Sequence, residues 1–263
     1  YVNGQYWGVY DLRERVDDNN YTDFYYGQDY IFQQSDLYLQ FLKTWGSTQV
    51  HFGNQPAIND WNSLVQFVQN NDMGDESLFE YVDSQLNIGS LIDYFVINSF
   101  VVSRDWLNYN TGWWRGLNPQ GDAQKWRYIL WDQEAGLGHY TNFTGMPDVT
   151  ATAPPCQVED LTVGSGHTQT LKKLIDQNPS VRQRYVTRYA DLLNTHFSCE
   201  NLITVLDSMV ANIATEMPRQ IQRWGGNITT WENNVQNVRD FLETRCQSLV
   251  TSLATCYNLT GPF

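Results

Sequence analysis

Carboxylate and amide side chains gather in the middle of this sequence with a spacing that suits phosphoryl transfer. Asp105 and Asn110 are separated by four residues, and Asp132 closely follows an apolar, strand-like run. Phosphoryl transfer needs an acidic residue near the attacking hydroxyl, an amide oxygen that helps to hold a metal ion, and a second carboxylate that binds the metal across the phosphates. The Arg-Asp-x4-Asn pattern starting at Arg104 matches the spacing of protein-kinase catalytic loops. We therefore predict Asp105 as the base or hydroxyl-orienting group and Asn110 and Asp132 as metal ligands.

The elements around these residues are expected to bring them to one place. Residues 88–103 are strongly apolar, which predicts a buried helix that delivers Asp105 into a cleft. Two strands joined by a turn with proline and glycine are predicted next, at residues 108–117 and 125–131. In one antiparallel hairpin, Asn110 and Asp132 would both lie at the open end, beside Asp105.

Further motifs place this stretch in a wider pattern. The chain contains NGQYWGVY at residues 3–10, DWLNYN at 105–110 and WDQEAG at 131–136, in that order. In these motifs it resembles the CotH kinase family, a group of atypical, secreted, kinase-like proteins similar to spore-coat protein H. The resemblance covers roughly residues 1–140 and implies that the chain is the larger, C-terminal part of the family's domain.

The resemblance implies an α+β, atypical protein-kinase-like fold in which a truncated β-rich N-terminal part precedes a mainly helical C-terminal part. It also implies a secreted or surface kinase that transfers the γ-phosphate of ATP to protein hydroxyls with Mg²⁺ or Mn²⁺. Glu134 would be a further metal ligand, at a position where the family usually has Asp. Glu14 would be the partner of a phosphate-binding basic residue. Lys43, the only lysine among the first hundred residues, either reaches phosphate or is an exposed lysine at a strand end.

Two other functions are compatible with these residues. The first is a catalytically inactive, kinase-like module that acts in surface binding, adhesion or coat assembly, because a fold does not settle a function. The second is a glycosidase that uses Asp132 and Glu134 as its pair of carboxylates. The glycosidase hypothesis leaves Asn110 and the spacing after Asp105 unexplained, so it ranks last.

Composition narrows the range of partners. The chain has 29 acidic and 16 basic residues, and its formal charge of −13 disfavours binding to nucleic acid and to anionic membranes. No run of eighteen or more apolar residues occurs, so no transmembrane segment is expected in this chain. With so few basic groups, binding a nucleotide would require a divalent cation to offset the phosphate charge. The protein substrate or surface partner is not identified by the sequence.

The four cysteines predict two disulfides and an oxidising compartment. No CxxC spacing occurs, which disfavours zinc and thioredoxin-like sites. The simplest of the three pairings joins Cys246 to Cys256 and Cys156 to Cys199. N-x-Ser/Thr sequons agree with a secreted or cell-surface protein and lie at Asn20, Asn142, Asn227 and Asn258.

The chain is expected to form one kinase-like unit with a cleft between two parts. In the first, residues 1–57, a tight hairpin around Asn3-Gly4 is predicted to reach Val16, and loops and short strands follow, the best strand being 37–43. The second, residues 58–263, carries the catalytic-loop-like hairpin, 103–138. Its predicted helices start near Ile58 and include 76–86, 88–103, 168–177, 178–195, 199–213, 217–224 and 231–254.

A long segment rich in glycine, proline and threonine, residues 136–166, separates the hairpin from the last helices. Irregular segments of this length are often functional lids or mobile segments, so we expect one of these here. His139 and His167 flank it, and neither has a second histidine at helical spacing. A structural role or simple exposure is therefore expected for both, rather than metal binding.

Overall fold

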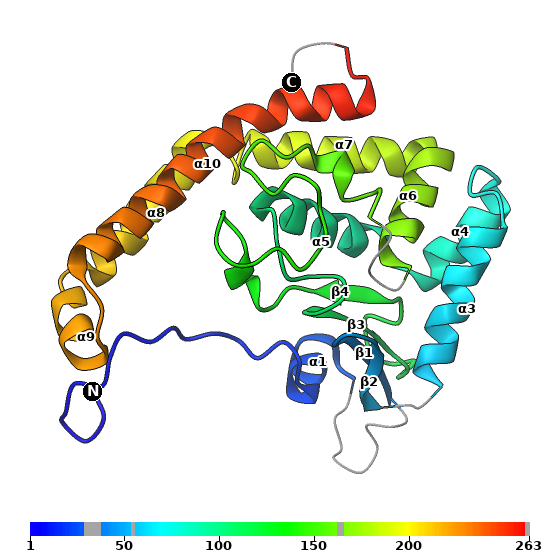
Figure 1. The fold of residues 1–263 in the computed structure, drawn as a ribbon. Coiled ribbons are helices and arrows are strands. Elements are labelled where there is room, and N and C mark those ends of the chain that lie inside the picture. The colour runs from blue at the N-terminus through cyan, green and yellow to red at the C-terminus, as the bar shows by residue number, and fades with distance from the viewer. Residues whose placement is uncertain (29–37, 54–55, 162–165, 261–263) are drawn as a thin grey trace.

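A computed structural model describes residues 1–28, 38–53, 56–161 and 166–260. Helices account for 54% of the chain and strands for 10%, so the fold is α+β with a mainly helical C-terminal part, as predicted (Figure 1). Among the helices of the described ranges, none has both the length and the apolar character needed to cross a membrane.

One antiparallel sheet forms the middle of the molecule, and its strand order is β2-β1-β3-β4. The strands are β1 (Leu39–Thr44), β2 (Thr48–Gly53), β3 (Thr111–Gly116) and β4 (Arg127–Ile129). The predicted hairpin of β3 and β4 is confirmed, with Trp113 opposite Tyr128. The predicted strand 37–43 overlaps β1 over residues 39–43; Tyr38 is not part of the strand, and Leu37 lies outside the described residues. Because β1 pairs with β3, the sheet joins strands from both sides of the expected boundary at residue 57.

The two faces of the sheet pack against different elements because side chains alternate along each strand. Leu42 and Trp113 belong to the main core, which they share with α3 (Ala57–Asn70), α5 (Ile88–Val101), α6 (His167–Gln177) and α7 (Pro179–Leu193). Phe41 and Trp114 point to the opposite face and form a smaller cluster. Tyr26 from α1 (Asn19–Tyr26) covers that cluster, with its ring centroid 5.1 Å from that of Trp114.

Aromatic rings fill the centre of the main core. Trp61 on α3 lies 5.5 Å, centroid to centroid, from both Trp113 and Trp126, and it is 1% exposed. His167, the first residue of α6, packs against the same rings, and its Nδ1 lies 2.7 Å from the hydroxyl of Tyr128. The structural role expected for His167 is therefore confirmed.

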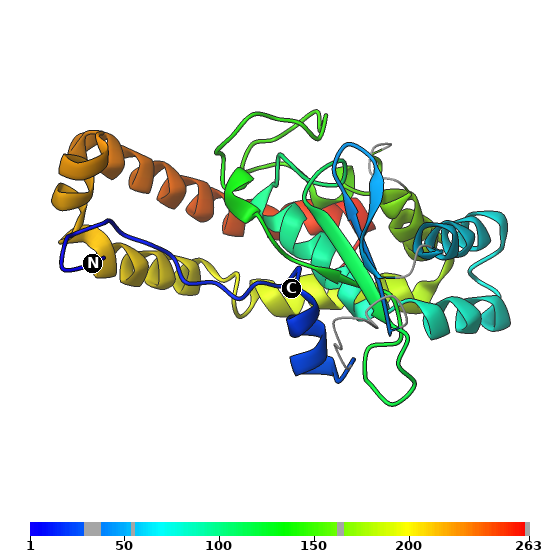
Figure 2. The ribbon, with the colours of Figure 1, turned by 90° about the horizontal axis from the view of Figure 1, so that it is seen from below.

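The C-terminal helices agree closely with the predicted ranges. They are α7, α8 (Cys199–Ala214), α9 (Met217–Trp224) and α10 (Ile228–Tyr257), after α4 (Glu76–Gln85) in the first half. Figures 1 and 2 show α8 and α10 running side by side away from the body, with α9 at the far end. In both views the N-terminal segment also extends to α9.

Two disulfides are present, but the predicted pairing is wrong. The bonds join Cys156 to Cys256 and Cys199 to Cys246. Cys246 and Cys256 lie on one helix, α10, and a rise of about 1.5 Å per residue separates them by about 15 Å, too far for a bond. The packing of α8 against α10 brings Cys199 to Cys246, with their Cα atoms 5.4 Å apart.

The N-terminal prediction is only partly correct. Asn3 and Gly4 form the expected turn, both with positive φ, and Val2 pairs with Gln5. The second arm up to Val16 is not a strand. It is extended chain that starts beside α9, where Trp224 Nε1 donates a hydrogen bond of 2.9 Å to Trp7 O. Residues 19–26 are helical rather than looped.

The segment 136–161 is mostly irregular, as expected, apart from the short 3₁₀ helix Pro155–Gln157, and several contacts fix it to the rest of the molecule. Arg104 donates hydrogen bonds of 3.0 Å to the carbonyls of Tyr140 and Val149. The buried Arg245 of α10 donates to the carbonyls of Ala151 and Ala153, and the disulfide of Cys156 adds a covalent link. The described part of this segment is thus fixed against the helical body, while residues 162–165 of the predicted lid lie outside the described residues.

Candidate active site

The end of α5 sets the position of Asp105. Val102 terminates this apolar helix in the left-handed conformation, and Ser103 N–H bonds to Asn98 O at 2.9 Å, which is the pattern of a Schellman cap. Such a cap usually has glycine, so a β-branched residue there is strained. The cap turns the chain sharply, and Asp105 follows it within three residues.

Two backbone hydrogen bonds join the end of α5 to the chain beyond β4. Arg104 N–H donates to Ala135 O at 3.0 Å, and Leu137 N–H donates to Val101 O at 2.7 Å. The short 3₁₀ helix Gln133–Ala135 ends at the first of these bonds. This connection holds the segment that carries Asp132 and Glu134 next to Asp105, although about thirty residues separate them in sequence.

The loop 105–110 is anchored from inside. The hydroxyl of Thr111 accepts hydrogen bonds from Leu107 N–H at 2.9 Å and from the Tyr94 hydroxyl at 3.0 Å. The side chain of Trp106 is 2% exposed and contacts the rings of Tyr94 and Phe95. Buried anchors therefore fix the loop, while the carboxylate of Asp105 stays near the surface.

Asp105 and Asn110 are in direct contact. Asn110 Nδ2 donates to Asp105 Oδ2 at 3.1 Å and to Asp105 O at 3.3 Å, which orients the carboxylate. Burial raises the pKa of Asp105, and the charge of Glu134 adds to this, whereas the hydrogen bond from Asn110 lowers it. Within the described ranges Asn110 Oδ1 accepts no hydrogen bond, so this oxygen is available to another ligand.

Asp132 and Glu134 share a hydrogen bond between their carboxyl groups. This bond, burial, and the charges of Glu134 and Asp105 raise the pKa of Asp132 to about 6. The same bond lowers the pKa of Glu134. Carboxyl groups in contact leave no space for a sugar ring between them, which argues against the glycosidase hypothesis. The pattern of shifts is instead that of two acids crowded at one place.

Backbone strain accumulates in the same region. Nine residues other than glycine have positive φ in the described part of the chain, and five of them lie here: Val102, Leu107, Asn110, Asp132 and Leu137. Strained conformations of this kind persist where the surrounding structure imposes them, and they cluster at functional sites. The strain at Asn110 and Asp132 falls on two of the predicted ligands.

A cavity of about 250 Å³ opens beside these residues, and both Asn110 and Asp132 line it. Lys43, at the end of β1, lies in its wall. The remaining lining residues come from the N-terminal segment and from the strand ends: Arg13, Asp17, Thr44, Trp45 and Trp131. The sequence gave no signal for Asp17 or Trp45, because their place in the cavity wall depends on the docking of distant segments.

Glu14 is placed elsewhere. Its side chain accepts a hydrogen bond of 3.3 Å from the Tyr25 hydroxyl and lines a different cavity, beside α1. The structure thus brings Asp105, Asn110, Asp132 and Glu134 close together. Asn110, Asp132 and Lys43 line one cavity, whereas Asp105, Glu134 and Glu14 are not part of its wall.

Oxygen donors dominate this site, and hard divalent cations prefer such donors. In the part of the chain that the structure describes, no three side chains of His, Cys, Asp or Glu are arranged to hold a metal ion on their own. A metal here would therefore depend on the amide oxygen of Asn110 and on ligands from outside the protein, in addition to the carboxylate of Asp132.

The α+β fold thus carries an Asp-x4-Asn loop close to a second aspartate, Asp132, which follows β4. The family model for CotH kinase protein matches residues 1–249, and the chain belongs to this family. The match extends well beyond the motifs near residues 1–140 and includes most of the C-terminal helices. Searches of curated proteins and of solved structures found no match.

Proposed function

We propose that this protein is a secreted or surface kinase that transfers the γ-phosphate of ATP to hydroxyl groups of proteins. The observation that carries this proposal is the contact between Asp105 and Asn110 at 3.1 Å, with Asp132 in the wall of the same cavity as Asn110. The three residues would supply what phosphoryl transfer requires. Asp105 would act on the attacking hydroxyl, Asn110 would be an amide ligand of the metal, and Asp132 would be the metal-binding carboxylate.

Asp105 would orient the substrate hydroxyl and accept its proton at a carboxylate oxygen. Its pKa is raised by burial, which makes it a stronger base than an exposed aspartate. Asn110 holds the carboxylate through its Nδ2 and leaves Oδ1 free for a second task. Asn110 would thus position the base and also supply a metal ligand. The Asp-x4-Asn spacing places the two side chains in the direct contact that this requires.

The donor set fits Mg²⁺ or Mn²⁺ together with ATP. Asn110 Oδ1 and Asp132 would hold the metal, which when bound supplies the positive charge that offsets the phosphates. Lys43 and Arg13 in the cavity wall would pair with phosphate oxygens. Glu134 would act beside the metal through Asp132, with which it already shares a hydrogen bond. Glu14 is proposed only as an indirect partner, because it lines another cavity.

The two disulfides support a location outside the cytoplasm. Disulfides form and persist in oxidising compartments and are rare in reducing ones. Both bonds here join segments far apart in sequence, at separations of 100 and 47 residues. We include secretion or surface display in the proposal on this ground.

The test is transfer of radiolabelled γ-phosphate from ATP to the chain itself and to generic acceptor proteins, with Mg²⁺ or Mn²⁺. We expect Asp105→Asn and Asp132→Ala each to reduce the rate by roughly 10²-fold to 10⁴-fold, because each removes a group that acts on the reacting atoms. Asp207→Asn, an equal change on the distant helix α8, should leave the rate unchanged. Circular dichroism should show all variants folded.

A second candidate function is a kinase-like binding module without catalysis. It is favoured by large apolar side chains that stay in solvent at the N-terminal segment and α9, such as Leu12 (100% exposed), Tyr10 (68%) and Trp224 (55%). Such surfaces commonly bind partners. If the folded wild-type protein neither binds ATP with metal nor transfers phosphate, the kinase proposal fails and this candidate replaces it.

A further inference from the structure

Trp45 is an exposed aromatic side chain at the mouth of the candidate active site. It lines the same cavity as Lys43, Asn110 and Asp132, and it is 60% exposed. An indole has two flat apolar faces, on which planar ligands stack. Because Trp45 reaches both the cavity and the solvent, it is available to a ligand that enters the cavity.

Contacts with the loop 105–110 fix the position of Trp45. The ring of Tyr109 meets the ring of Trp45 edge-to-face, with centroids 5.4 Å apart and planes at 88°. Next to it, Gly46 N–H donates a hydrogen bond of 2.7 Å to Asn108 O. In the described part of the chain no other aromatic ring contacts Trp45. The turn between β1 and β2 thus holds the indole beside this loop and leaves it uncovered by a parallel ring.

The cavity wall also contains a cation that is close to Trp45 in sequence. Lys43 lies two positions before Trp45 and forms no ion pair with any described residue. Asp17, a carboxylate in the same wall, is instead paired with Arg15 at 3.2 Å. A ligand with an anionic group and a planar ring therefore finds a partner for each in one cavity.

The volume of the cavity limits how much of a ligand it encloses. At about 250 Å³ it is below the 300–1,000 Å³ that is usual for ligand sites. Phosphates and a metal ion held by Asn110 and Asp132 would occupy this space, so the rest of a nucleotide would extend to the mouth. Of the two tryptophans among the described lining residues, Trp45 is exposed and Trp131 is half-buried. The base of a nucleotide would thus meet Trp45.

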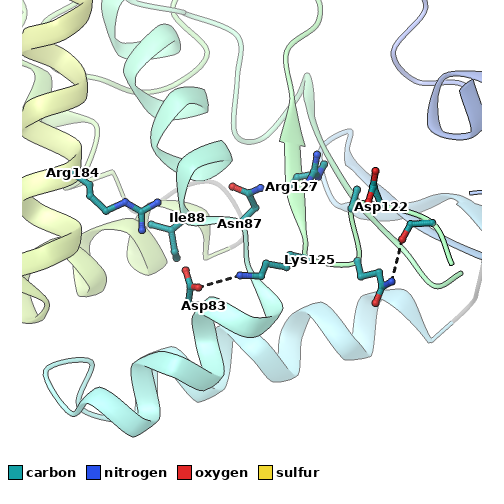
Figure 3. Close-up of a pocket in the computed structure, with 10 residues that line it drawn as sticks. Asp83, Asn87, Ile88, Asp122, Lys125, Arg127 and Arg184 are labelled. Atoms are coloured by element: carbon teal, nitrogen blue, oxygen red, sulfur yellow. Dashed lines mark hydrogen bonds and ion pairs between the residues drawn. The ribbon is translucent and has the colours of Figure 1, made fainter. Parts of the chain in front are cut away.

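The larger cavity that Figure 3 shows is less suited to a nucleotide. Its volume is about 590 Å³, but none of the described residues that line it is aromatic. Lys125 in its wall is already paired with Asp83 at 3.1 Å (Figure 3). The guanidinium of Arg127 packs 4.9 Å from the ring centroid of Tyr26. This cavity therefore offers neither a platform for a base nor a set of cations that converge on one phosphate.

We propose that Trp45 binds the nucleobase of the nucleoside triphosphate by stacking, an inference that rests on the proposed kinase function. The base lies on the indole at the cavity mouth, while Lys43 and the metal ion hold the phosphates inside. Stacking tolerates any base because every base has a flat face. Trp45 thus contributes to the affinity for nucleotides without selecting adenine over guanine.

Calorimetric titration of the full chain with ATP, GTP and tripolyphosphate, each with Mg²⁺, tests this inference. We expect Trp45→Ala to weaken the binding of ATP and GTP by similar factors, about 5-fold to 100-fold, because both lose a stacking contact. Tripolyphosphate has no base, so its affinity should be unchanged. Trp45→Phe keeps an aromatic face and should restore most of the lost affinity. Trp224→Ala removes a similarly exposed tryptophan on α9 and should bind all three like wild type.

The three probes separate this inference from the proposed function. If wild type binds ATP and tripolyphosphate but Trp45→Ala binds ATP unchanged, the inference is overturned and the kinase proposal stands. An equal loss of affinity for ATP and tripolyphosphate also overturns it, because the indole then supports the phosphate site, and so does a loss confined to ATP or to GTP. If wild type binds none of the three, the kinase proposal fails and the inference fails with it. Because Trp45 is exposed, its variants are expected to fold, which circular dichroism would check.

Discussion

Two regions beside the β3–β4 hairpin hold their titratable side chains in opposite ways. In the aromatic core, burial lowers the pKa of His167 to about 3 and raises that of Tyr128 well above its usual range, so both stay neutral. At the open end, burial and nearby carboxylates raise the pKa of Asp105 and that of Asp132, the latter to about 6. The core excludes charge, whereas the open end brings like charges together.

The backbone follows the same division. Asn110 and Asp132 both have left-handed φ, at 53° and 50°, whereas the core residues Trp61, Trp113 and Tyr128 lie in regular helix and strand. Strained residues and crowded acids each cost stability, and only the surrounding packing can offset that cost. This difference indicates that the core holds in place a site that would not form by itself.

The largest expected effect on stability comes from removing the centre of the core. We expect Trp61→Ala to lower the free energy of unfolding by about 3–5 kcal/mol, because it leaves a cavity among closely packed rings. Guanidinium chloride denaturation would measure this. Trp224→Ala, which removes a tryptophan that is 55% exposed, should cost much less. An equal loss of unfolding free energy in Trp61→Ala and Trp224→Ala would contradict a division between core and surface.

A smaller loss is expected from Tyr128→Phe. The hydroxyl of Tyr128 lies 2.7 Å from His167 Nδ1, and removing it leaves that nitrogen buried without its partner. Such a loss costs about 1–3 kcal/mol. Tyr81→Phe, at a side chain that is 47% exposed, serves as the control in the same denaturation assay. If Tyr128→Phe were neutral, the core would not depend on this pairing.

The pH dependence of the free energy of unfolding should show the contribution of the buried, neutral His167. Because its folded pKa is about 3 and its ordinary value is 6.5, the unfolded chain binds a proton between these pH values and the folded chain does not. Stability is therefore lost as the pH falls below about 6.5, by up to about 1.4 kcal/mol for each pH unit from this group. Denaturation at pH 7.5 and pH 5 should show a smaller loss for His167→Gln than for wild type. Identical losses would contradict this assignment.

The smallest expected effect is an increase in stability. Asp132→Asn removes a carboxylate beside Glu134 and Asp105, and asparagine tolerates the left-handed conformation well. We expect the free energy of unfolding at pH 7 to rise by about 0.5–1 kcal/mol while phosphate transfer is lost. Thermal unfolding monitored with the activity assay would show both changes. A fall in stability would mean that the carboxylate supports the fold rather than the reaction.

Local features of the fold could be predicted because they depend on neighbouring residues. The apolar run of α5 and the Pro-Gly turn before β4 were sufficient to place a helix and a hairpin around Asp105 and Asp132. Helix α1 was missed because only Thr22 among its residues is buried, so its apolar periodicity is weak. Its cap signals, Asp18 and Gly27, were present and could have identified it.

By itself the sequence determined the residue types of the candidate site, the spacing of Asp105 and Asn110, and the boundaries of most helices. Only the tertiary structure decided that Lys43 joins that site, that Glu14 lies outside its cavity, and that Cys156 bonds to Cys256. The physical reason is range. Periodicity and capping act over a few residues, whereas these outcomes depend on contacts between segments far apart in the chain, which form only when the whole core packs.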